Sequence, residues 1–284
     1  MWFAFRYSLL ILVLHPVLAL ADTSAAIKDL RDSKARQPHI TVEIIAEKAI
    51  SRERPARLGV LFTPDPGWHI YWRNPGDTGM APIISWHGEA QFGELNWPFP
   101  ESIPISHLVN LGYHGDTVLW SSYLVDSGLA DSEGGIMNAD VEWLVCKESC
   151  IPGSAKLGVD VSMISDAAHE RASALFGQAE IKRPKPIDTM AASARATDER
   201  VIFELYAKNP LFREVANVEV FVENLDLVAY GEPLRVQAFK NVLRWEQALN
   251  EYNQSLPPVL RALVVIDQQQ AYEVNVPIDL STMN

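Results

Sequence analysis

The sequence has 284 residues, a formal net charge of −12 and 48% hydrophobic residues. This length is enough for two domains of ordinary size, each with its own hydrophobic core. An acidic chain without clusters of basic residues is a poor nucleic-acid binder, so we expect no nucleic-acid partner.

The first residues have the pattern of an export signal. Arg6 supplies positive charge, Leu9–Leu14 forms an apolar core, and Ala19-Leu20-Ala21 is a small-x-small cleavage site. These features predict a signal peptide over residues 1–21 and therefore a periplasmic location. An uncleaved anchor is the alternative. Because the apolar run is too short to cross a bilayer, and no later run is longer, we expect no stable membrane span.

Residues 22–37 are polar and predict a flexible lead-in. A first β-domain is predicted over residues 38–165, where short alternating runs are separated by turn signals. Phe99–Val109 is rich in proline and is expected to be irregular. Many short strands with regular turns predict a β-sandwich. The expected strands are Ile40–Ile45, Ala56–Thr63, Trp68–Trp72, Pro82–Trp86, Gly93–Trp97 and Thr117–Val125.

At Asp166–Gln178 the spacing of apolar residues changes to that of a helix, and Asp166 is the predicted N-cap. We assign residues 166–193 to this helix and a linker, in which Lys182–Pro186 is semi-rigid. Residues 194–284 predict a second β-domain without cysteine. Its expected strands are Arg200–Ala207, Val215–Val222, Leu234–Ala238, Leu243–Trp245, Leu260–Asp267 and Ala271–Ile278.

The segment Asp140–Lys156 holds Cys146 and Cys150, which are the only two cysteines of the sequence. Apolar residues alternate on both sides of the pair, and Pro152-Gly153 argues against a helix there. The cysteines are therefore predicted to lie where a β-hairpin turns. Partner residues in a hairpin are about 4.5–5.5 Å apart at Cα, a separation that a disulfide accepts.

A disulfide at this place has three interpretations. A loop of about five residues gives a stabilisation of only roughly 2 kcal/mol, which a domain of this size hardly needs. The spacing therefore favours a redox-active pair, while a structural disulfide and a metal-binding pair stay open. The histidines are scattered, and we predict no resident metal or cofactor; they include His69, His87, His107 and His114.

The segment WLVCKESCIPGSAKL, with GYHGDTVLW before it and PGWHIYWRNPGDTG further upstream, resembles the N-terminal periplasmic domain of the DsbD thiol:disulfide interchange family. It is closer still to the exported part of the related copper-tolerance reductase ScsB. The resemblance is strongest over Ile40–Val161 and looser over Ala194–Leu280. It implies an all-β fold of two immunoglobulin-like β-sandwich domains joined by a short helix and linker. It also implies a protein that shuttles electrons by thiol:disulfide exchange.

Carried over by position, Cys146 and Cys150 match the redox pair of this family. The resemblance implies that Cys150 forms mixed disulfides with partners and that Cys146 resolves them. It also implies a cap loop that shields the pair, placed here within Ser102–Val109, with Tyr113 beside it. The residues expected over the disulfide are Ile105, Ser106, His107 and Leu108. An ordinary crossover between strands is the alternative for this segment.

The partners that the resemblance implies are thioredoxin-like periplasmic proteins and a membrane thiol reductase, in cytochrome c biogenesis or copper tolerance. The sequence departs from the DsbD pattern in two ways. Three residues separate the cysteines, where DsbD has five, and the sequence contains neither a membrane electron carrier nor a thioredoxin-like domain. We therefore expect its reductant to be another protein. Two other functions stay open, namely a binding or assembly module with a structural disulfide and a Cu(I)-handling protein, because thiolates suit Cu(I).

Overall fold

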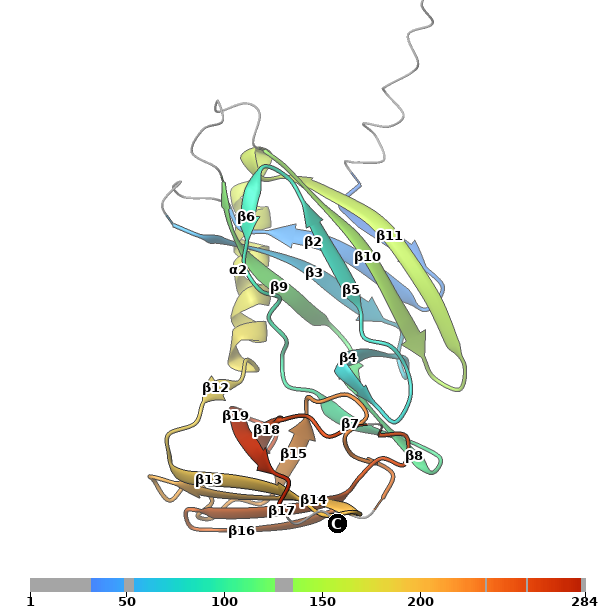
Figure 1. Ribbon diagram of the computed structural model, residues 1–284. Coiled ribbons are helices and arrows are strands. Elements are labelled where there is room, and N and C mark those ends of the chain that lie inside the picture. Colours follow the sequence, from blue (N-terminus) through green and yellow to red (C-terminus); the bar gives the residue numbers. More distant parts are fainter. Residues whose placement is uncertain (1–31, 49–53, 126–134, 233, 254, 282–284) are drawn as a thin grey trace, which may run out of the picture.

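The computed structural model describes residues 32–48, 54–125, 135–232, 234–253 and 255–281. The predicted signal peptide, and the predicted lead-in as far as residue 31, lie outside these ranges. The described part is built mainly from β-strands, and its one α-helix follows the first group of strands along the chain and precedes the second (Figure 1). No helix in this part is long and apolar enough to cross a membrane.

Two sheets face each other in the N-terminal unit, a name we use for residues 32–164. The first sheet has the strand order β1-β2-β3-β9-β6. The second has the order β11-β10-β4-β8-β7, and β5 pairs with β10. The strands of the first sheet are β1 (Lys34–Gln37), β2 (Ile40–Ala46), β3 (Ala56–Pro64), β6 (Ala90–Phe92) and β9 (Thr117–Val125). Those of the second are β4 (His69–Gly76), β5 (Ile83–His87), β7 (Glu101–Ile105), β8 (Leu108–His114), β10 (Ile136–Cys146) and β11 (Cys150–Asp160).

The core of the N-terminal unit lies between these sheets. Successive side chains of a strand point to opposite faces, so alternate residues enter the core. Val42 and Val60 come from the first sheet, and Trp72 and Trp143 come from the second. All four side chains are buried. The result is the β-sandwich that the alternating runs predict.

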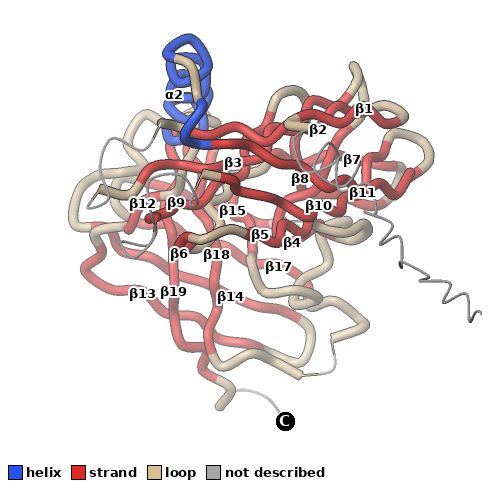
Figure 2. Tube along the Cα trace, turned by 90° about the horizontal axis from the view of Figure 1, so that it is seen from above, coloured by secondary structure: helices blue, strands red, loops and turns tan. Residues whose placement is uncertain are grey.

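A single helix covers the outer face of the first sheet (Figure 2). The short 3-10 helix η1 (Val161–Met163) leads into α2 (Asp166–Ile181). Ser165, rather than the predicted Asp166, is the N-cap, because its hydroxyl accepts a hydrogen bond from the amide of Ala168 at 3.2 Å. Phe176 is buried against β3. Close packing needs a glycine at position 59, since a Cβ there would lie 2.8 Å from the Phe176 ring.

The C-terminal unit, residues 185–281, is a sheet that bends around its own core. Its order is β15-β18-β19-β13-β14-β17-β16, and β12 also pairs with β19. Because β19 pairs with strands on both sides of the bend, two layers form (Figure 1). Phe203, Trp245 and Val264 lie in the core between them. The strands are β12 (Lys185–Pro186), β13 (Thr189–Ala196), β14 (Arg200–Ala207), β15 (Val218–Val222), β16 (Arg235–Phe239), β17 (Val242–Ala248), β18 (Val259–Ile266) and β19 (Gln270–Asp279).

Several predicted segments differ from the structure. The predicted irregular segment forms β7 and the start of β8, because β7 lies at a sheet edge, where Pro104 without its N–H is tolerated. The predicted strand Gly93–Trp97 is replaced by β6, which occupies the pairing edge of β9. Within Gly93–Trp97, Asn96 forms an isolated β-bridge to Trp120.

The boundaries of the two units also differ from those predicted. The predicted flexible lead-in contains β1, whose polar residues suit an edge strand that pairs only with β2. The predicted linker contains β12, which pairs in parallel with β19. The C-terminal unit therefore begins before residue 194. A partner distant in the sequence decides the structure of β12, whereas β1 forms a hairpin with the neighbouring β2.

The two units share packed residues at their junction. Trp72 of β4 meets Phe221 of β15 edge to face, with ring centroids 6.4 Å apart. Next to it, Arg73 pairs with Glu223 at 3.1 Å. Strand β4 is therefore held on one side by the N-terminal sandwich and on the other by the C-terminal unit.

Candidate functional site

The two cysteines close the β10–β11 hairpin, as predicted. The strands pair residue by residue from Ile136 and Asp160 to Cys146 and Cys150. The cysteines form a disulfide with a Cα–Cα distance of 4.2 Å. Both pairing and alternation therefore follow the pattern that the sequence shows on either side of the pair.

The two sulfur-bearing residues differ in exposure. Cys146 is 2% exposed, whereas Cys150 lies on the exposed edge strand β11. Cys146 is covered because it pairs on its other side with His69, the first residue of β4. An attacking group from solvent therefore reaches Cys150 more easily than Cys146.

The hydroxyl of Tyr71 contacts the disulfide. It donates a hydrogen bond to Cys146 Sγ at 2.9 Å and lies 3.6 Å from Cys150 Sγ. Burial raises the pKa of Tyr71 to about 12, so this hydroxyl keeps its proton at neutral pH. The site thus has a fixed hydrogen-bond donor directed at the less exposed sulfur.

Two further polar residues hold the Tyr71 hydroxyl. The amide nitrogen of buried Asn110 donates to the Tyr71 oxygen at 3.3 Å. Thr78 donates its hydroxyl to the Asn110 amide oxygen at 2.7 Å. Since the Tyr71 oxygen already accepts from Asn110, its own proton is free to point at Cys146.

His69 is a buried neutral group beside the disulfide. It is 1% exposed, and its Nε2 has no hydrogen-bond partner among the described residues. Burial, followed by the nearby charge of His114, lowers the pKa of His69 to about 4. His114 itself contacts Glu101, with Nδ1 2.8 Å from Oε1. At neutral pH His69 is therefore uncharged.

The predicted cap residues form the turn between β7 and β8. Ile105 pairs with Leu108, and Ser106 and His107 lie between them. The carbonyl of His107 is close to Gly231 of the C-terminal unit, where a Cβ would lie 2.4 Å from that oxygen. The turn therefore packs against the second unit. Its role as a cap over the disulfide stays a prediction.

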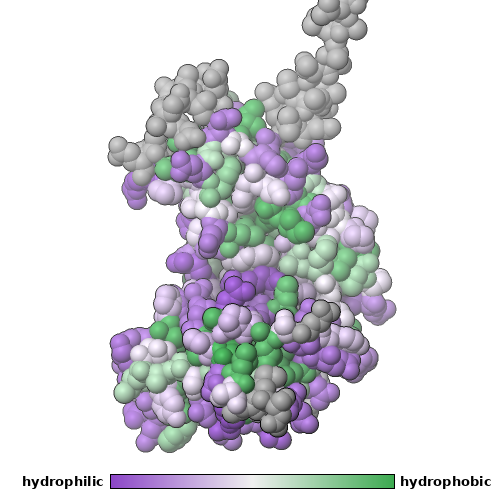
Figure 3. Space-filling view, in the orientation of Figure 1, coloured by the Kyte–Doolittle hydropathy of each residue, from purple (hydrophilic) through white to green (hydrophobic). Residues whose placement is uncertain are grey.

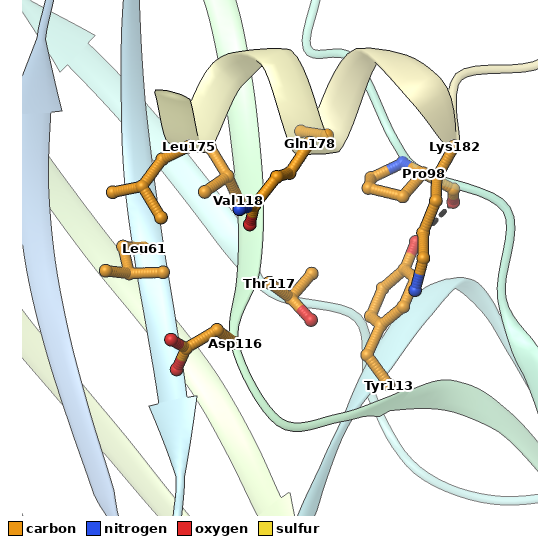
Figure 4. A pocket seen from close by; sticks show the side chains of 10 residues that line it. Leu61, Pro98, Tyr113, Asp116, Thr117, Val118, Leu175, Gln178 and Lys182 are labelled. Atoms are coloured by element: carbon orange, nitrogen blue, oxygen red, sulfur yellow. Dashed lines mark hydrogen bonds between the residues drawn. The ribbon is translucent and has the colours of Figure 1, made fainter. Parts of the chain in front are cut away.

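Tyr113 lies on the core side of β8. It pairs with Ile70, and its buried hydroxyl donates to the carbonyl of Pro98 at 2.7 Å. Burial raises the pKa of this hydroxyl well above its usual range. Figure 4 shows Tyr113 below the C-terminal end of α2, where it lines a small cavity of 120 Å³ with Thr117 and Lys182. Its side chain and that of Tyr71 therefore leave the sheet on opposite faces.

Sequence reasoning missed Tyr71, Asn110 and His69. The run WHIYW carried one usable signal, because alternation places His69 and Tyr71 on one face and Trp68, Ile70 and Trp72 on the other. Nothing in the sequence shows that β4 lies beside the cysteine hairpin. For metals, the described residues contain no group of three or more His, Cys, Asp or Glu that is placed to hold an ion.

The fold and the site together define a β-sandwich domain that carries a disulfide on a hairpin, with one exposed cysteine and one buried cysteine. Residues 40–160 match the family model described as thiol:disulfide interchange protein DsbD, N-terminal, so this part of the chain is a domain of the DsbD/ScsB type. It is thus a thiol:disulfide interchange type of module with an immunoglobulin-like sandwich, as the resemblance implied.

The chain is similar in structure to the N-terminal periplasmic domain of ScsB from Proteus mirabilis, with a TM-score of 0.69 and 20% identity, covering 89% of this chain and 100% of that one. At this identity the likeness shows the fold. Two other structures have TM-scores of 0.19 and carry no argument. The first is the YadV chaperone, at 10% identity, covering 84% of this chain and 99% of that one. The second is SGBP-B of the Bacteroides ovatus mixed-linkage glucan utilization locus, at 8% identity, covering 87% of this chain and 62% of that one. No curated protein matches the sequence.

Proposed function

We propose that this protein exchanges its disulfide with protein partners and that Cys150 is the sulfur they attack. The observation that carries the proposal is the difference in exposure between the two cysteines, 2% for Cys146 against an exposed Cys150. Attack in thiol–disulfide exchange depends on access to the sulfur and on the leaving thiolate. Both factors favour Cys150 as the attacked atom and Cys146 as the leaving group.

The exchange proceeds in two steps. A partner thiolate attacks Cys150 Sγ, the bond between Cys146 and Cys150 breaks, and Cys146 leaves as a thiolate. The partner's second thiolate then attacks the partner's sulfur in the mixed disulfide, which forms the partner's disulfide and releases Cys150 as a thiolate. Two electrons pass from the partner, which becomes a disulfide, and both cysteines of this protein take up protons. The reverse sequence reduces a substrate disulfide, with Cys146 resolving the mixed disulfide.

Tyr71 supports the first step. Its hydroxyl donates to Cys146 Sγ at 2.9 Å, and a hydrogen bond to a thiolate is stronger than one to a neutral sulfur. The donor is already in place in the disulfide form. The leaving thiolate of Cys146 is therefore stabilised as it forms.

The surface near this site has exposed apolar side chains that suit a protein partner. Ile83 on β5 is 51% exposed, and Met80 in the preceding loop is 41% exposed. Figure 3 shows apolar side chains over the face of the N-terminal unit that carries β5. We infer that thioredoxin-like periplasmic proteins dock here and that a membrane thiol reductase supplies the electrons. The family match and the structural similarity to a periplasmic domain of ScsB support a periplasmic location, with two β-sandwich domains in the exported chain.

Trapping of mixed disulfides tests the proposal. With Cys146→Ser the exposed Cys150 remains, and we expect it to hold a thioredoxin-like dithiol protein as a stable mixed disulfide on a non-reducing gel. The matched Cys150→Ser variant leaves the buried Cys146 and should trap much less. If Cys150→Ser traps as much as Cys146→Ser, the assignment of the attacked sulfur is wrong. If neither variant traps a partner, the exchange function is wrong.

The reduction potential separates this function from a purely structural disulfide. Structural disulfides typically have potentials below about −300 mV, and exchange-competent ones lie above that value. Equilibration of the protein with glutathione or dithiothreitol buffers gives the potential directly. We expect a value above about −300 mV, and a lower one would favour a structural role.

A further inference from the structure

The segment Asn74–Gly79, with the sequence NPGDTG, connects the C-terminal unit to the disulfide. Asn74 is buried, and its amide nitrogen donates to the carbonyls of Val222 at 2.8 Å and Asn224 at 3.2 Å. Its amide oxygen accepts from the amide of Gly76 at 3.1 Å. The start of the segment is therefore fixed to β15 of the C-terminal unit and turned by its own side chain.

Asp77 fixes the middle of the segment to both units. One carboxylate oxygen accepts from the amide of Tyr230, in the C-terminal unit, at 2.8 Å. The other accepts from the amide of Val109, in β8, at 2.8 Å, and the Asp77 amide donates to the Val109 carbonyl at 3.0 Å. A single side chain thus joins the loop after β4, strand β8 and the C-terminal unit.

The end of the segment reaches the disulfide through three side chains. Thr78 donates to Asn110, Asn110 donates to Tyr71, and Tyr71 donates to Cys146. The distances are 2.7, 3.3 and 2.9 Å. Gly79 lies on the Tyr71 ring, where a Cβ would approach within 2.1 Å of a ring carbon. Both the ring and the hydroxyl of Tyr71 are therefore held by this segment.

The orientation of the Asn110 amide decides where the Tyr71 proton points. When the amide nitrogen faces Tyr71, the Tyr71 oxygen is an acceptor and its proton is directed to Cys146. If the amide turned over, its oxygen would compete with the sulfur for that proton. Thr78 favours the first orientation because its hydroxyl donates to the amide oxygen. The position of Thr78 in turn depends on Asp77, its neighbour in sequence.

We propose that the C-terminal unit is a positioning element for the disulfide and that it acts through Asp77 and Thr78 on the Tyr71 hydroxyl. The inference rests on the exchange function proposed above, for which Tyr71 stabilises the leaving thiolate. It gives the second unit a role in the reaction although the hydrogen bonds to the two sulfurs, among the described residues, come from the N-terminal unit. Asp77, Thr78 and Asn110 are positioning residues that work through Tyr71.

The test measures the pKa of the Cys146 thiol in the reduced chain. In a Cys150→Ser background Cys146 is the only thiol, and the pH dependence of its alkylation by iodoacetamide gives its pKa. Asp77→Asn leaves one of the two backbone amides facing an NH₂ group instead of an oxygen. We expect the Cys146 pKa to rise by about one unit, which is a tenfold fall in thiolate below the pKa.

A matched control is Asp267→Asn. Asp267 also accepts from two backbone amides, those of Ala216 at 2.9 Å and Asn217 at 2.7 Å, but it lies within the C-terminal unit. This control should leave the Cys146 pKa unchanged. An equal shift in both variants would overturn the proposal, because the effect would then come from a general loosening of the C-terminal unit.

Thr78→Val provides a second variant that keeps the side-chain shape and removes only the hydroxyl. It should raise the Cys146 pKa in the same direction, and if Asp77→Asn fails to fold, an unchanged Cys146 pKa in Thr78→Val overturns the proposal. A shift with Thr78→Val but none with a folded Asp77→Asn would overturn the role of the C-terminal unit, and no shift in either would overturn the whole relay. Because the readout needs no partner, it is independent of the trapping experiment that tests the exchange function.

Discussion

The hydrogen bond from Tyr71 to the disulfide leads to a quantitative prediction for Tyr71→Phe. The substitution keeps the buried ring and removes the hydroxyl that lies 2.9 Å from Cys146 Sγ. A hydrogen bond to a charged group contributes about 1.5–3 kcal/mol, and one pKa unit corresponds to about 1.36 kcal/mol. We therefore expect the pKa of the Cys146 thiol to rise by about one to two units.

The same loss changes the reduction potential. Since the Tyr71 hydroxyl stabilises the thiolate more than the disulfide sulfur, the wild-type protein has the more stable reduced form. Removing the hydroxyl favours the disulfide wherever Cys146 is ionised. About 30 mV corresponds to 1.4 kcal/mol for this two-electron couple, so the potential should fall by roughly 30–60 mV at pH values above the thiol pKa.

Two assays check these values. Alkylation of the reduced Cys150→Ser variant as a function of pH gives the pKa of Cys146, and redox buffers give the potential of the two-cysteine protein. Tyr123→Phe is the matched control, because Tyr123 is also buried and donates its hydroxyl to the Glu47 carbonyl at 2.8 Å. An unchanged or lowered pKa in Tyr71→Phe would show that the hydroxyl does not stabilise the thiolate.

Two further predictions concern stability. Unfolded His69 takes up its proton near pH 6.5 and the folded group only near pH 4, so the unfolded state binds more protons between these values and the protein loses stability as the pH falls through this range. In His69→Gln this loss of unfolding free energy between pH 7 and pH 4.5 should be smaller by roughly 2 kcal/mol, allowing for screening by solvent. His107→Gln, at an exposed position, is the control and should leave the loss as it is in the wild-type protein. Urea unfolding at the two pH values measures both variants. Phe176→Ala should lower the free energy of unfolding by about 3–5 kcal/mol, because it empties the buried contact between α2 and β3, and a loss below about 1 kcal/mol in a urea titration would contradict that packing.

Residue patterns within single segments predicted several of the observed elements. The strands Thr117–Val125 and Arg200–Ala207 have the predicted bounds, and the cysteine hairpin has the predicted register. Both strands are rich in β-branched and aromatic residues, and the cysteine hairpin turns back on its immediate neighbour. In such segments the side-chain period and the turn residues decide the structure together.

Several other errors come from contacts between segments far apart in the sequence. The polar β1 was missed although it forms a hairpin with its neighbour β2. β12 is also polar, and it is a strand only because β19, far along the sequence, offers a free edge. The donor to the disulfide was missed for the same reason, since Tyr71 and Cys146 are 75 residues apart. A residue's type shows that it can donate a hydrogen bond, but only the fold shows which acceptor it meets.

The role of the disulfide in the fold is small, which is what repeated exchange requires. Ten residue pairs from Ile136 and Asp160 to Val145 and Ile151 hold the hairpin without it. The loop of about five residues that the bond closes contributes roughly 2 kcal/mol, and about 1 kcal/mol shifts the melting temperature of a chain of this size by about 2–4 °C. Reduction should therefore lower the melting temperature by about 4–8 °C or less, with the same circular dichroism spectrum below the transition. The comparison is a thermal scan of the oxidised protein against the same protein in excess dithiothreitol. A much larger fall, or a loss of strand signal on reduction, would mean that the bond is needed to hold the hairpin, and the exchange reaction would then have to disrupt part of the fold in each cycle.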